Sequence, residues 1–222
     1  SAASDVYKRQ LLMIPNIPDD EVPEGTDESS NLELEKIIYK QPDNGPDHVE
    51  IGELIELLDF NTANKLSGSR FVVLKGKLAQ LQRALIRFML DEAASNGYEE
   101  YYVPYIVNSE SLIGTGQLPK FEDDQFSVGE GKYLIPTAEV PLTNVFRNEA
   151  ISVDDMPIKM TAHTPCFRAE AGSYGKDTRG MIRQHQFEKI ELVKFVHPNE
   201  SEKALDELVN HASKILDKLE LS

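Results

Sequence analysis

Apolar residues recur at helical spacing along residues 77–96. The stripe consists of Leu78, Leu81, Leu85, Phe88 and Met89. Because positions three, four and seven apart share one face of a helix, this pattern predicts an amphipathic helix packed against a core. Gly97 follows the stripe and supplies the left-handed residue with which many helices end.

Two further segments predict helices. Residues 50–58 are a short helical candidate. Residues 199–219 carry a longer amphipathic stripe, with Asn199 and Glu202 as its candidate cap pair. The apolar members of that stripe are Ala204, Leu205, Leu208, Ala212, Ile215, Leu216 and Leu219.

Residues 98–107 (YEEYYVPYIV) are rich in aromatic and β-branched side chains and predict a strand after the first helix. Pro104 lies inside this run and has no N–H to donate to a sheet ladder. We therefore expect the strand at a sheet edge, at a bulge or at an interface.

Two more strands are predicted at residues 165–170 and 183–195, joined by the polar segment 171–180. This segment contains three glycines together with Ser173, Asp177 and Thr178. It is longer than the two to five residues of common hairpin loops, which favours a functional loop.

Side-chain alternation along these two strands places charged and aromatic residues on common faces. In the first strand, Arg168 and Glu170 share a face. The second strand holds on one face Arg183, Phe187 and Glu191. Its opposite face holds Ile190 and Leu192.

These residue types suit a nucleotide. The planar guanidinium of Arg168 matches a phosphate bidentately, and Glu170 can accept from an exocyclic amine or orient the arginine. Phe187 can stack on a base, a contact worth ~1–3 kcal/mol. The alternative is a set of surface ion pairs worth ~0–1 kcal/mol, with Phe187 in the core. Charges on strands of buried character are costly without partners, so a ligand site is favoured.

Residues 131–147 (GKYLIPTAEVPLTNVFR) predict a short strand at 133–135 that Pro136 breaks. A helix is expected to begin near Thr137 and Glu139. A hydroxyl and a carboxylate at such a junction can receive an ammonium group. Alternatively, Thr137 is only a helix N-cap and Glu139 is only favoured by the helix dipole.

Length and composition indicate a globular chain with one large domain. The 222 residues are 40% hydrophobic and 27% charged, as in ordinary packed domains. Residues 1–10 predict a non-native or frayed appendage, and residues 11–50, rich in Pro, Gly, Asp and Asn, predict an extended connector. Residues 51–222 are expected to form an α+β domain, a mostly antiparallel sheet flanked by helices.

The net charge of −15 argues against a broad nucleic-acid-binding surface, because phosphate contacts require Lys and Arg. Any such contact is expected to be local or to come from a region outside this chain. No apolar run reaches the ~18 residues that a membrane helix needs. The single cysteine, Cys166, fits a reducing compartment, the cytoplasm, and is expected to be a small buried side chain.

We expect no metal site in the protein. His163, Cys166 and His185 would have to form one, as in a metal hydrolase, but their spacing fits no usual zinc pattern. The acidic segment 122–124 is expected at a solvent-exposed lid edge.

Much of the chain resembles the seryl-tRNA synthetase family of class II aminoacyl-tRNA synthetases. The similarity runs from Leu11 to the last residue, and its centre is the block 166–195, with an Arg-x-Glu pair, a Gly-rich loop and Arg-x-x-x-Phe. The other matching segments are IPNIP at 14–18, VPEGTDESSN at 22–31, LLDF at 57–60, KLSGSRFVVLKG at 65–76, GTGQLPKF at 114–121 and YLIPTAEVPLTN at 133–144.

This resemblance implies a class II synthetase fold. Its motif 1, the homodimer-forming element, would be the helix and strand around Pro104, and its motif 2 the block 166–195. The residues implied to bind L-serine are Thr137, Ala138, Glu139 and Glu191. The residues implied to bind ATP are Arg168, Ala169, Glu170, Arg183 and Phe187, with Arg168 and Glu170 as the catalytic ones.

The reaction that the resemblance implies joins L-serine to ATP as seryl-adenylate, releases pyrophosphate, and passes the seryl group to tRNA(Ser). The resemblance also implies Mg²⁺, which would neutralise charge on the ATP phosphates. Two family features are missing from the sequence: a third motif with an arginine for the γ-phosphate, and an N-terminal helical arm that clasps tRNA. We therefore expect a middle segment of a longer protein that is inactive alone.

Two alternatives stay open beside this hypothesis. The chain could be a non-catalytic truncated paralogue that acts as a nucleotide- or partner-binding module. It could also belong to a protein that activates an amino acid for a carrier protein rather than for tRNA.

Overall fold

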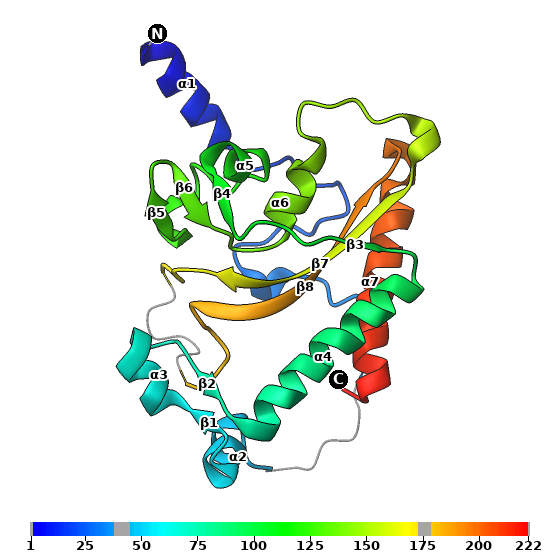
Figure 1. Ribbon diagram of the computed structural model, residues 1–222. Coiled ribbons are helices and arrows are strands. Elements are labelled where there is room, and N and C mark those ends of the chain that lie inside the picture. Colours follow the sequence, from blue (N-terminus) through cyan, green and yellow to red (C-terminus); the bar gives the residue numbers. More distant parts are fainter. Residues whose placement is uncertain (1, 38–44, 173–178, 222) are drawn as a thin grey trace.

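Two long antiparallel strands, β7 (Ile158–Phe167) and β8 (Gln186–Phe195), form the centre of the fold (Figure 1). They pair along their whole length. The short strand β3 (Glu99–Glu100) pairs in parallel with the other edge of β7. The computed structural model describes residues 2–37, 45–172 and 179–221. Its helices and mostly antiparallel sheets confirm the expected α+β class.

Alternation along β8 gives the central sheet two different faces. On one face, Ile190 and Leu192 line a cavity of about 220 Å³ together with residues of α4 (Gly76–Ser95) and α7 (Ser201–Leu219). Against the opposite face lies α6 (Glu139–Thr143). The helices predicted at residues 77–96 and 199–219 are thus confirmed, and so is the side to which Ile190 and Leu192 point.

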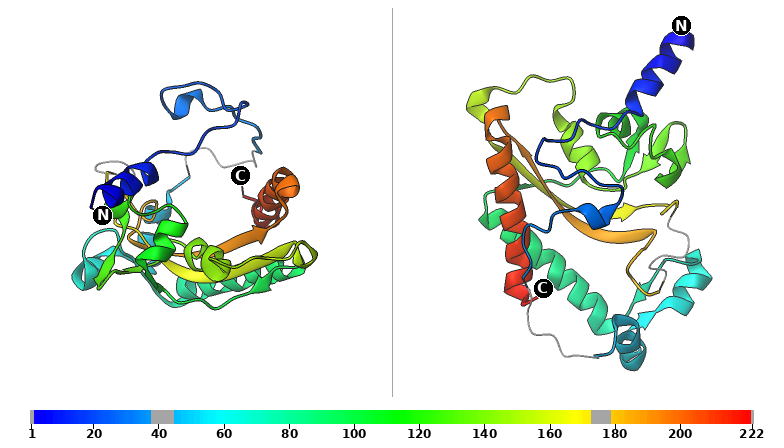
Figure 2. Two further views of the ribbon diagram at one scale, coloured as in Figure 1. Left: turned by 90° about the horizontal axis from the view of Figure 1, so that it is seen from above. Right: turned by 180° about the vertical axis from the view of Figure 1, so that it is seen from behind.

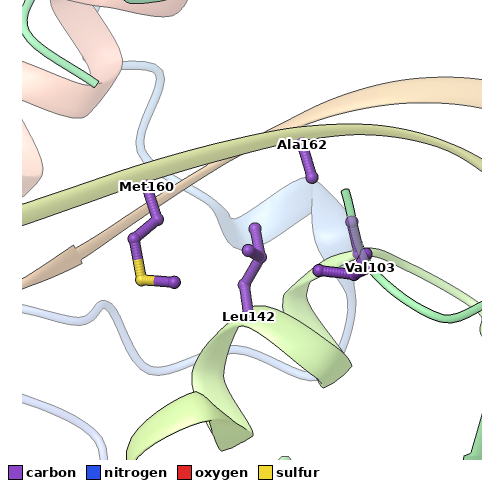
Figure 3. Packing of buried hydrophobic residues seen from close by; sticks show 5 residues of the cluster. Val103, Leu142, Met160 and Ala162 are labelled. Carbon is purple, nitrogen blue, oxygen red and sulfur yellow. The ribbon is translucent and has the colours of Figure 1, made fainter. Parts of the chain in front are cut away.

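The main hydrophobic core lies between α6 and the sheet. Its buried members are Val103, Ala138, Leu142, Met160 and Ala162. Figure 3 shows Leu142 of α6 extending toward the β7 residues Met160 and Ala162. Leu142 and Met160 are fully buried, and burying a side chain of this size contributes ~1.5–3 kcal/mol. This packing fixes α6, and with it the residues just before α6, against the sheet.

A second antiparallel sheet, with the strand order β4-β6-β5, packs next to α6. The elements of this region are β4 (Ile106–Asn108), α5 (Ser109–Gly114), the turn η2 (Glu122–Asp124), β5 (Ser127–Gly129) and β6 (Lys132–Leu134). Leu112 of α5 packs with Leu118 and with Val140 of α6. The strand predicted at residues 133–135 is therefore confirmed, one residue earlier.

The strand predicted at residues 98–107 is two separate strands and not one, although both lie at sheet edges, as predicted. Its two ends belong to different sheets, β3 and β4, and Pro104 lies between them. The Tyr101 N–H still donates to the Thr161 carbonyl at 2.8 Å, and the Tyr105 carbonyl accepts from the Ile135 N–H at 2.9 Å. Since Pro104 has no N–H, pairing stops there and the chain crosses from one sheet to the other.

The N-terminal part begins with α1 (Ala2–Leu12), which projects away from the other elements (Figure 1, and the right view of Figure 2). Residues 13–37 follow with little regular structure beyond the turn η1 (Glu28–Ser30). The side chains of α1 from Ser4 onward are exposed. No core residue comes from residues 4–37.

The helix predicted at residues 50–58 is present as α2 (His48–Ile55). It starts earlier because Asp47 caps it and forms a capping box with Glu50. It ends earlier because Glu56 adopts a left-handed φ of 56°. The elements that follow are β1 (Leu58–Asp59), α3 (Phe60–Ser67) and β2 (Val73–Leu74), of which β1 and β2 pair antiparallel.

The cap pair predicted for the C-terminal helix is wrong. The N-cap of α7 is Glu200, with no side-chain cap hydrogen bond. Asn199 instead lies inside the preceding turn η5 (Pro198–Glu200), where its N–H donates to the His197 Nδ1 at 3.2 Å. The turn-forming Pro198 and the His197 acceptor thus move the helix start past Asn199.

Two further observations concern the single cysteine and the hydropathy of the helices. Cys166 is fully buried, as predicted, and burial raises the pKa of its thiol. Among the helices of the described ranges, none is both long and apolar enough to span a bilayer.

Candidate functional site

A polar cavity of about 400 Å³ opens where β7 ends and α6 begins. Five of the predicted site residues line it, namely Thr137, Glu139, Arg168, Glu170 and Arg183. The other lining residues are Gln117, Phe121, Asp124, Gln125, Pro136 and Ala171. The fold therefore brings together the two predicted groups, the segment before α6 and the segment after β7.

Arg168 is held at the mouth of this cavity by both its backbone and its side chain. Its N–H donates to the His185 carbonyl at 3.0 Å, and its Nε donates to the Pro136 carbonyl at 3.2 Å. Its guanidinium carbon lies 5.1 Å from the centroid of the Phe187 ring. Among the described residues, none accepts from the two terminal nitrogens, so this fork is available to an anion.

The strand predicted at residues 165–170 has the wrong bounds, because β7 begins at Ile158 and ends at Phe167. Glu170 has a left-handed φ of 52°, which strand alternation does not allow. Asp124 of η2 holds this segment instead: its carbonyl accepts from the Ala169 N–H at 2.9 Å and its Oδ1 from the Ala171 N–H at 2.7 Å. Arg168 and Glu170 thus reach the same cavity through these contacts and not through alternation.

Arg183 pairs with Glu170 at 3.1 Å, from Nη1 to Oε2. The strand predicted at 183–195 is also too long, since β8 begins at Gln186. Alternation therefore holds for Phe187 and Glu191 and not for Arg183, which joins the site through the ion pair. Of the connecting segment, Ser173, Asp177 and Thr178 lie outside the described residues.

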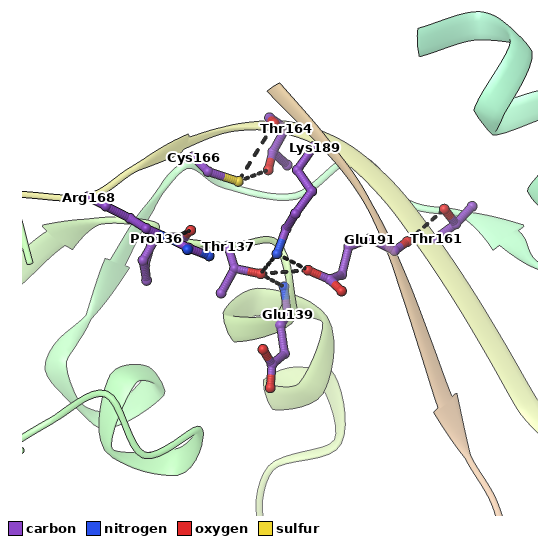
Figure 4. Close-up of polar contacts among 9 residues, drawn as sticks. All are labelled: Pro136, Thr137, Glu139, Thr161, Thr164, Cys166, Arg168, Lys189 and Glu191. Carbon is purple, nitrogen blue, oxygen red and sulfur yellow. Dashed lines mark hydrogen bonds and ion pairs between the residues drawn. The ribbon is translucent and has the colours of Figure 1, made fainter. Parts of the chain in front are cut away.

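Thr137 is the centre of a hydrogen-bond network (Figure 4). Its buried hydroxyl donates to the Glu191 Oε2 at 2.6 Å. The same oxygen accepts from the Lys189 Nζ at 2.7 Å and from the Glu139 N–H at 3.1 Å. Thr137 therefore accepts from the first amide of α6, as the helix-cap alternative predicted, and it also donates to Glu191. Its role in receiving an ammonium group stays a prediction.

Ala138 and Glu139 have different environments. The Ala138 side chain is fully buried in the core against Leu142 and Met160, so it does not reach the cavity. The Glu139 side chain is exposed and lines the cavity. Only the hydroxyl and the carboxylate of this tripeptide therefore present side-chain groups to a ligand.

Two residues of the site were missed from the sequence. Lys189 contacts both Thr137 and Glu191, and its place two residues from Phe187 and from Glu191 on β8 was a usable signal. Asp124 was expected at a solvated edge, which is wrong, because it is half-buried and holds the segment around Glu170. No local pattern marks it, since its partners are more than 40 residues away.

The three candidate metal ligands have separate partners. His163 Nε2 lies 2.7 Å from the Glu188 Oε2, and His185 Nδ1 donates to the Arg168 carbonyl at 2.9 Å. Cys166 is buried beside Thr164. In the part of the chain that the structure describes, no group of three or more His, Cys, Asp or Glu residues is arranged to hold a metal ion.

The arrangement combines two kinds of binding group. Arg168 supplies donors for an anion and contacts the Phe187 ring, while Thr137 lines the cavity and hydrogen-bonds to Glu191. The cavity itself can hold an anion beside polar groups of a ligand. Phe187 lines a separate cavity of about 880 Å³ between β8 and α4.

Sequence comparison gives this geometry a family context. Residues 120–222 match the family described as tRNA synthetase class II core domain (G, H, P, S and T). The serine–tRNA ligase of Nitrosomonas europaea is 55% identical over 95% of this chain. The chain spans about half the length of the curated relatives it matches, 52% in this case.

Two solved structures resemble this one over nearly the whole chain. Seryl-tRNA synthetase from Pyrococcus horikoshii, complexed with ATP, has a TM-score of 0.89 and 32% identity, with 99% of this chain and 54% of that chain covered. The cytoplasmic enzyme from Naegleria fowleri, in complex with AMP, has a TM-score of 0.86 and 29% identity, with 96% and 52% covered.

Proposed function

Because this chain belongs to the seryl-tRNA synthetase family of class II aminoacyl-tRNA synthetases, we propose that its cavity binds ATP and L-serine and joins them as seryl-adenylate. The serine then passes to tRNA(Ser), which makes the parent protein a serine–tRNA ligase. The observation that carries this proposal is the meeting of Arg168, Glu170 and Arg183 with Thr137 in one cavity.

For ATP, Arg168 is the central residue. The fork of its terminal nitrogens takes the α-phosphate, while its Nε stays on the Pro136 carbonyl. Phe187, already beside this guanidinium, stacks on adenine. Glu170 accepts from the exocyclic amine, and Arg183, its ion-pair partner, serves the phosphate side. Ala169 supplies backbone to the same ATP-binding segment.

For L-serine, the segment from Thr137 to Glu139 and the carboxylate of Glu191 form the subsite. Thr137 and Glu191 already share a hydrogen bond of 2.6 Å, so their relative position is set before the substrate arrives. Glu139 adds a second carboxylate to attract the ammonium group. Ala138 contributes by anchoring this segment in the core.

The chemistry needs no enzyme nucleophile. The serine carboxylate attacks the α-phosphorus in line, a P–O bond to the new anhydride forms, and the P–O bond to pyrophosphate breaks. Negative charge grows on a non-bridging oxygen and on the leaving group. The protein acts by holding the reactants in place and by directing fixed donors at that charge, and Arg168 and Glu170 are the catalytic pair.

Mg²⁺ is expected to bind together with ATP, and the carboxylate oxygens of the cavity are ligands that suit this ion. The cavity offers the carboxylates of Asp124, Glu139 and Glu170, of which Glu170 is paired with Arg183. Mg²⁺ usually binds through one or two carboxylates plus substrate phosphates and keeps several waters. When bound, the ion neutralises charge on the phosphates.

The partners of the parent protein follow from the same proposal. A homodimer would form through the surface around Pro104, where Tyr102 has 89% of its surface exposed. Because this chain has a net charge of −15, tRNA(Ser) would be contacted locally or by other parts of the parent protein. Residues 51–222 would form the catalytic part, after the connector at residues 11–50, and the protein would act in the cytoplasm.

The test is ATP–pyrophosphate exchange with L-serine, run on this chain and on the full-length product of its gene, followed by tRNA charging. We expect serine-dependent exchange and charging of tRNA(Ser) by the full-length product. Exchange without charging of any tRNA would favour activation for a carrier protein. ATP binding with no exchange would favour a nucleotide-binding module.

A further inference from the structure

We propose that Lys189 is a positioning residue of the amino-acid subsite, which fixes one oxygen of Glu191 so that the other oxygen faces the substrate. The inference rests on the proposed function and adds a residue to it. Lys189 and Glu191 are two residues apart on β8 and share the face that looks toward α6.

Three polar atoms form a closed triangle at this place (Figure 4). The Lys189 Nζ lies 2.7 Å from the Glu191 Oε2 and 2.7 Å from the Thr137 Oγ1. The Thr137 Oγ1 lies 2.6 Å from the same Oε2. Each pair of atoms is within hydrogen-bond distance, so the three side chains restrain one another.

The contacts to the Glu191 carboxylate both end on Oε2. Within the described part of the chain, no donor reaches the second oxygen, Oε1, and Figure 4 shows it turned away from the triangle. A carboxylate held at one oxygen by two donors cannot rotate freely about its terminal bond. The remaining oxygen is therefore presented as an acceptor in a fixed direction.

Thr137 alone is not sufficient for this. With one donor on Oε2, the carboxylate could still swing about that single contact. The Glu191 side chain is also only 19% exposed, so its charge is poorly hydrated and needs a counter-ion. The ammonium of Lys189 supplies both the second donor and the positive charge.

The consequence is that the site discriminates between substrates with and without a hydroxyl group. A fixed acceptor favours a substrate with a hydroxyl donor, because a substrate without one leaves the second oxygen of Glu191 without a hydrogen bond. Lys189 therefore acts on the discrimination between serine and alanine through Glu191, without a contact to the substrate of its own.

The test uses serine-dependent pyrophosphate exchange by the full-length gene product. Lys189→Met keeps the length of the side chain and removes the ammonium, and Lys189→Arg restores a cation. Lys203→Met, at an exposed lysine of α7, is the matched control. We expect Lys189→Met to raise the KM for serine and to lower serine-over-alanine preference by about tenfold or more, with the KM for ATP little changed. Lys189→Arg should recover part of both losses.

Unchanged serine KM and unchanged preference in Lys189→Met would overturn the inference. Equal rises in the KM for serine and for ATP would also overturn it, because they would indicate general damage to the fold. If Lys189→Met does not fold, Lys189→Gln, which keeps one donor without the charge, is measured against the same criteria. Absence of serine-dependent exchange in the unsubstituted protein would instead reject the proposed function.

Discussion

Arg168 lies over the ring of Phe187, with its guanidinium carbon 5.1 Å from the ring centroid. The same side chain donates from Nε to the Pro136 carbonyl at 3.2 Å. A cation–π contact of this kind is worth ~0.5–2 kcal/mol, and together the two contacts hold the guanidinium in one place. The residue proposed for the α-phosphate and the residue proposed for adenine are thus adjacent before a nucleotide binds.

Arg168→Ala should abolish adenylate formation. Loss of one preorganised donor costs ~3–4 kcal/mol in the transition state, which lowers pyrophosphate exchange by about 100- to 1,000-fold. Exchange with saturating serine and ATP measures this in the full-length gene product. Arg87→Ala is the control, since Arg87 is an exposed residue of α4. If Arg168→Ala keeps more than about a tenth of the exchange rate, the role given to this arginine is wrong.

Phe187→Leu should weaken ATP binding and leave serine binding alone. A lost stack costs ~1–3 kcal/mol, so the KM for ATP rises about 5- to 150-fold. The KM for each substrate is measured separately in the exchange reaction. Phe187→Tyr keeps the ring and should behave like the unsubstituted protein. A leucine variant with an unchanged KM for ATP would place adenine elsewhere.

Glu191→Gln should reduce the preference for serine over alanine. A site built to bond a substrate hydroxyl can reject the analogue without it by about 10⁴-fold. The Glu191→Gln substitution replaces the charged acceptor by a neutral amide. Exchange rates with serine and with alanine give the preference. Glu188→Gln, three residues before Glu191 and on the other face of β8, is the control because the partner of Glu188 is His163. Equal preference in both variants would move the serine-reading residue elsewhere.

Gly180→Ala should destabilise the protein more than Gly172→Ala. Both glycines have a left-handed φ, +74° and +81°, which costs alanine ~1–2 kcal/mol. A Cβ on Gly180 would lie 2.0 Å from the His48 Nε2, whereas a Cβ on Gly172 meets no atom of the described residues within 4 Å. Displacing His48 also breaks its hydrogen bond from the Met181 N–H at 2.8 Å. Urea unfolding of the two variants measures the difference, and equal losses would mean that the His48 contact contributes no stability.

Asp59→Ala should lower stability at neutral pH and have little effect near pH 2. The Asp59 carboxylate accepts from the Thr62 N–H and hydroxyl and pairs with Lys75, which lowers its pKa from 3.8 to about 2. Because the folded pKa is below the unfolded one, the contribution is complete above about pH 4 and is lost as the pH falls toward 2. Unfolding free energies of both proteins across this range test the sign. A gap as wide at pH 2 as at pH 7 would contradict it.

Sequence alone determined the features that depend on local backbone geometry. The helical stripe at residues 77–96 gave α4 within one residue at each end, and Gly97 adopts the left-handed φ of 80° expected of it. Alternation placed Phe187 and Glu191 on the face of the site. These predictions were right because the spacing of apolar residues in the sequence follows the way a helix or strand directs consecutive side chains toward a core.

Tertiary structure alone decided how the site is assembled. Thr137 reaches Glu191 across 54 residues, and Asp124 fixes the backbone around Glu170 from 47 residues away. Tertiary structure also decided that β7 ends at Phe167, before Arg168. Hydrogen bonds and ion pairs between distant segments leave no period in the sequence, because their energy depends on which segments the core brings together. The chemistry of the residues was therefore readable in advance, whereas their geometry was not.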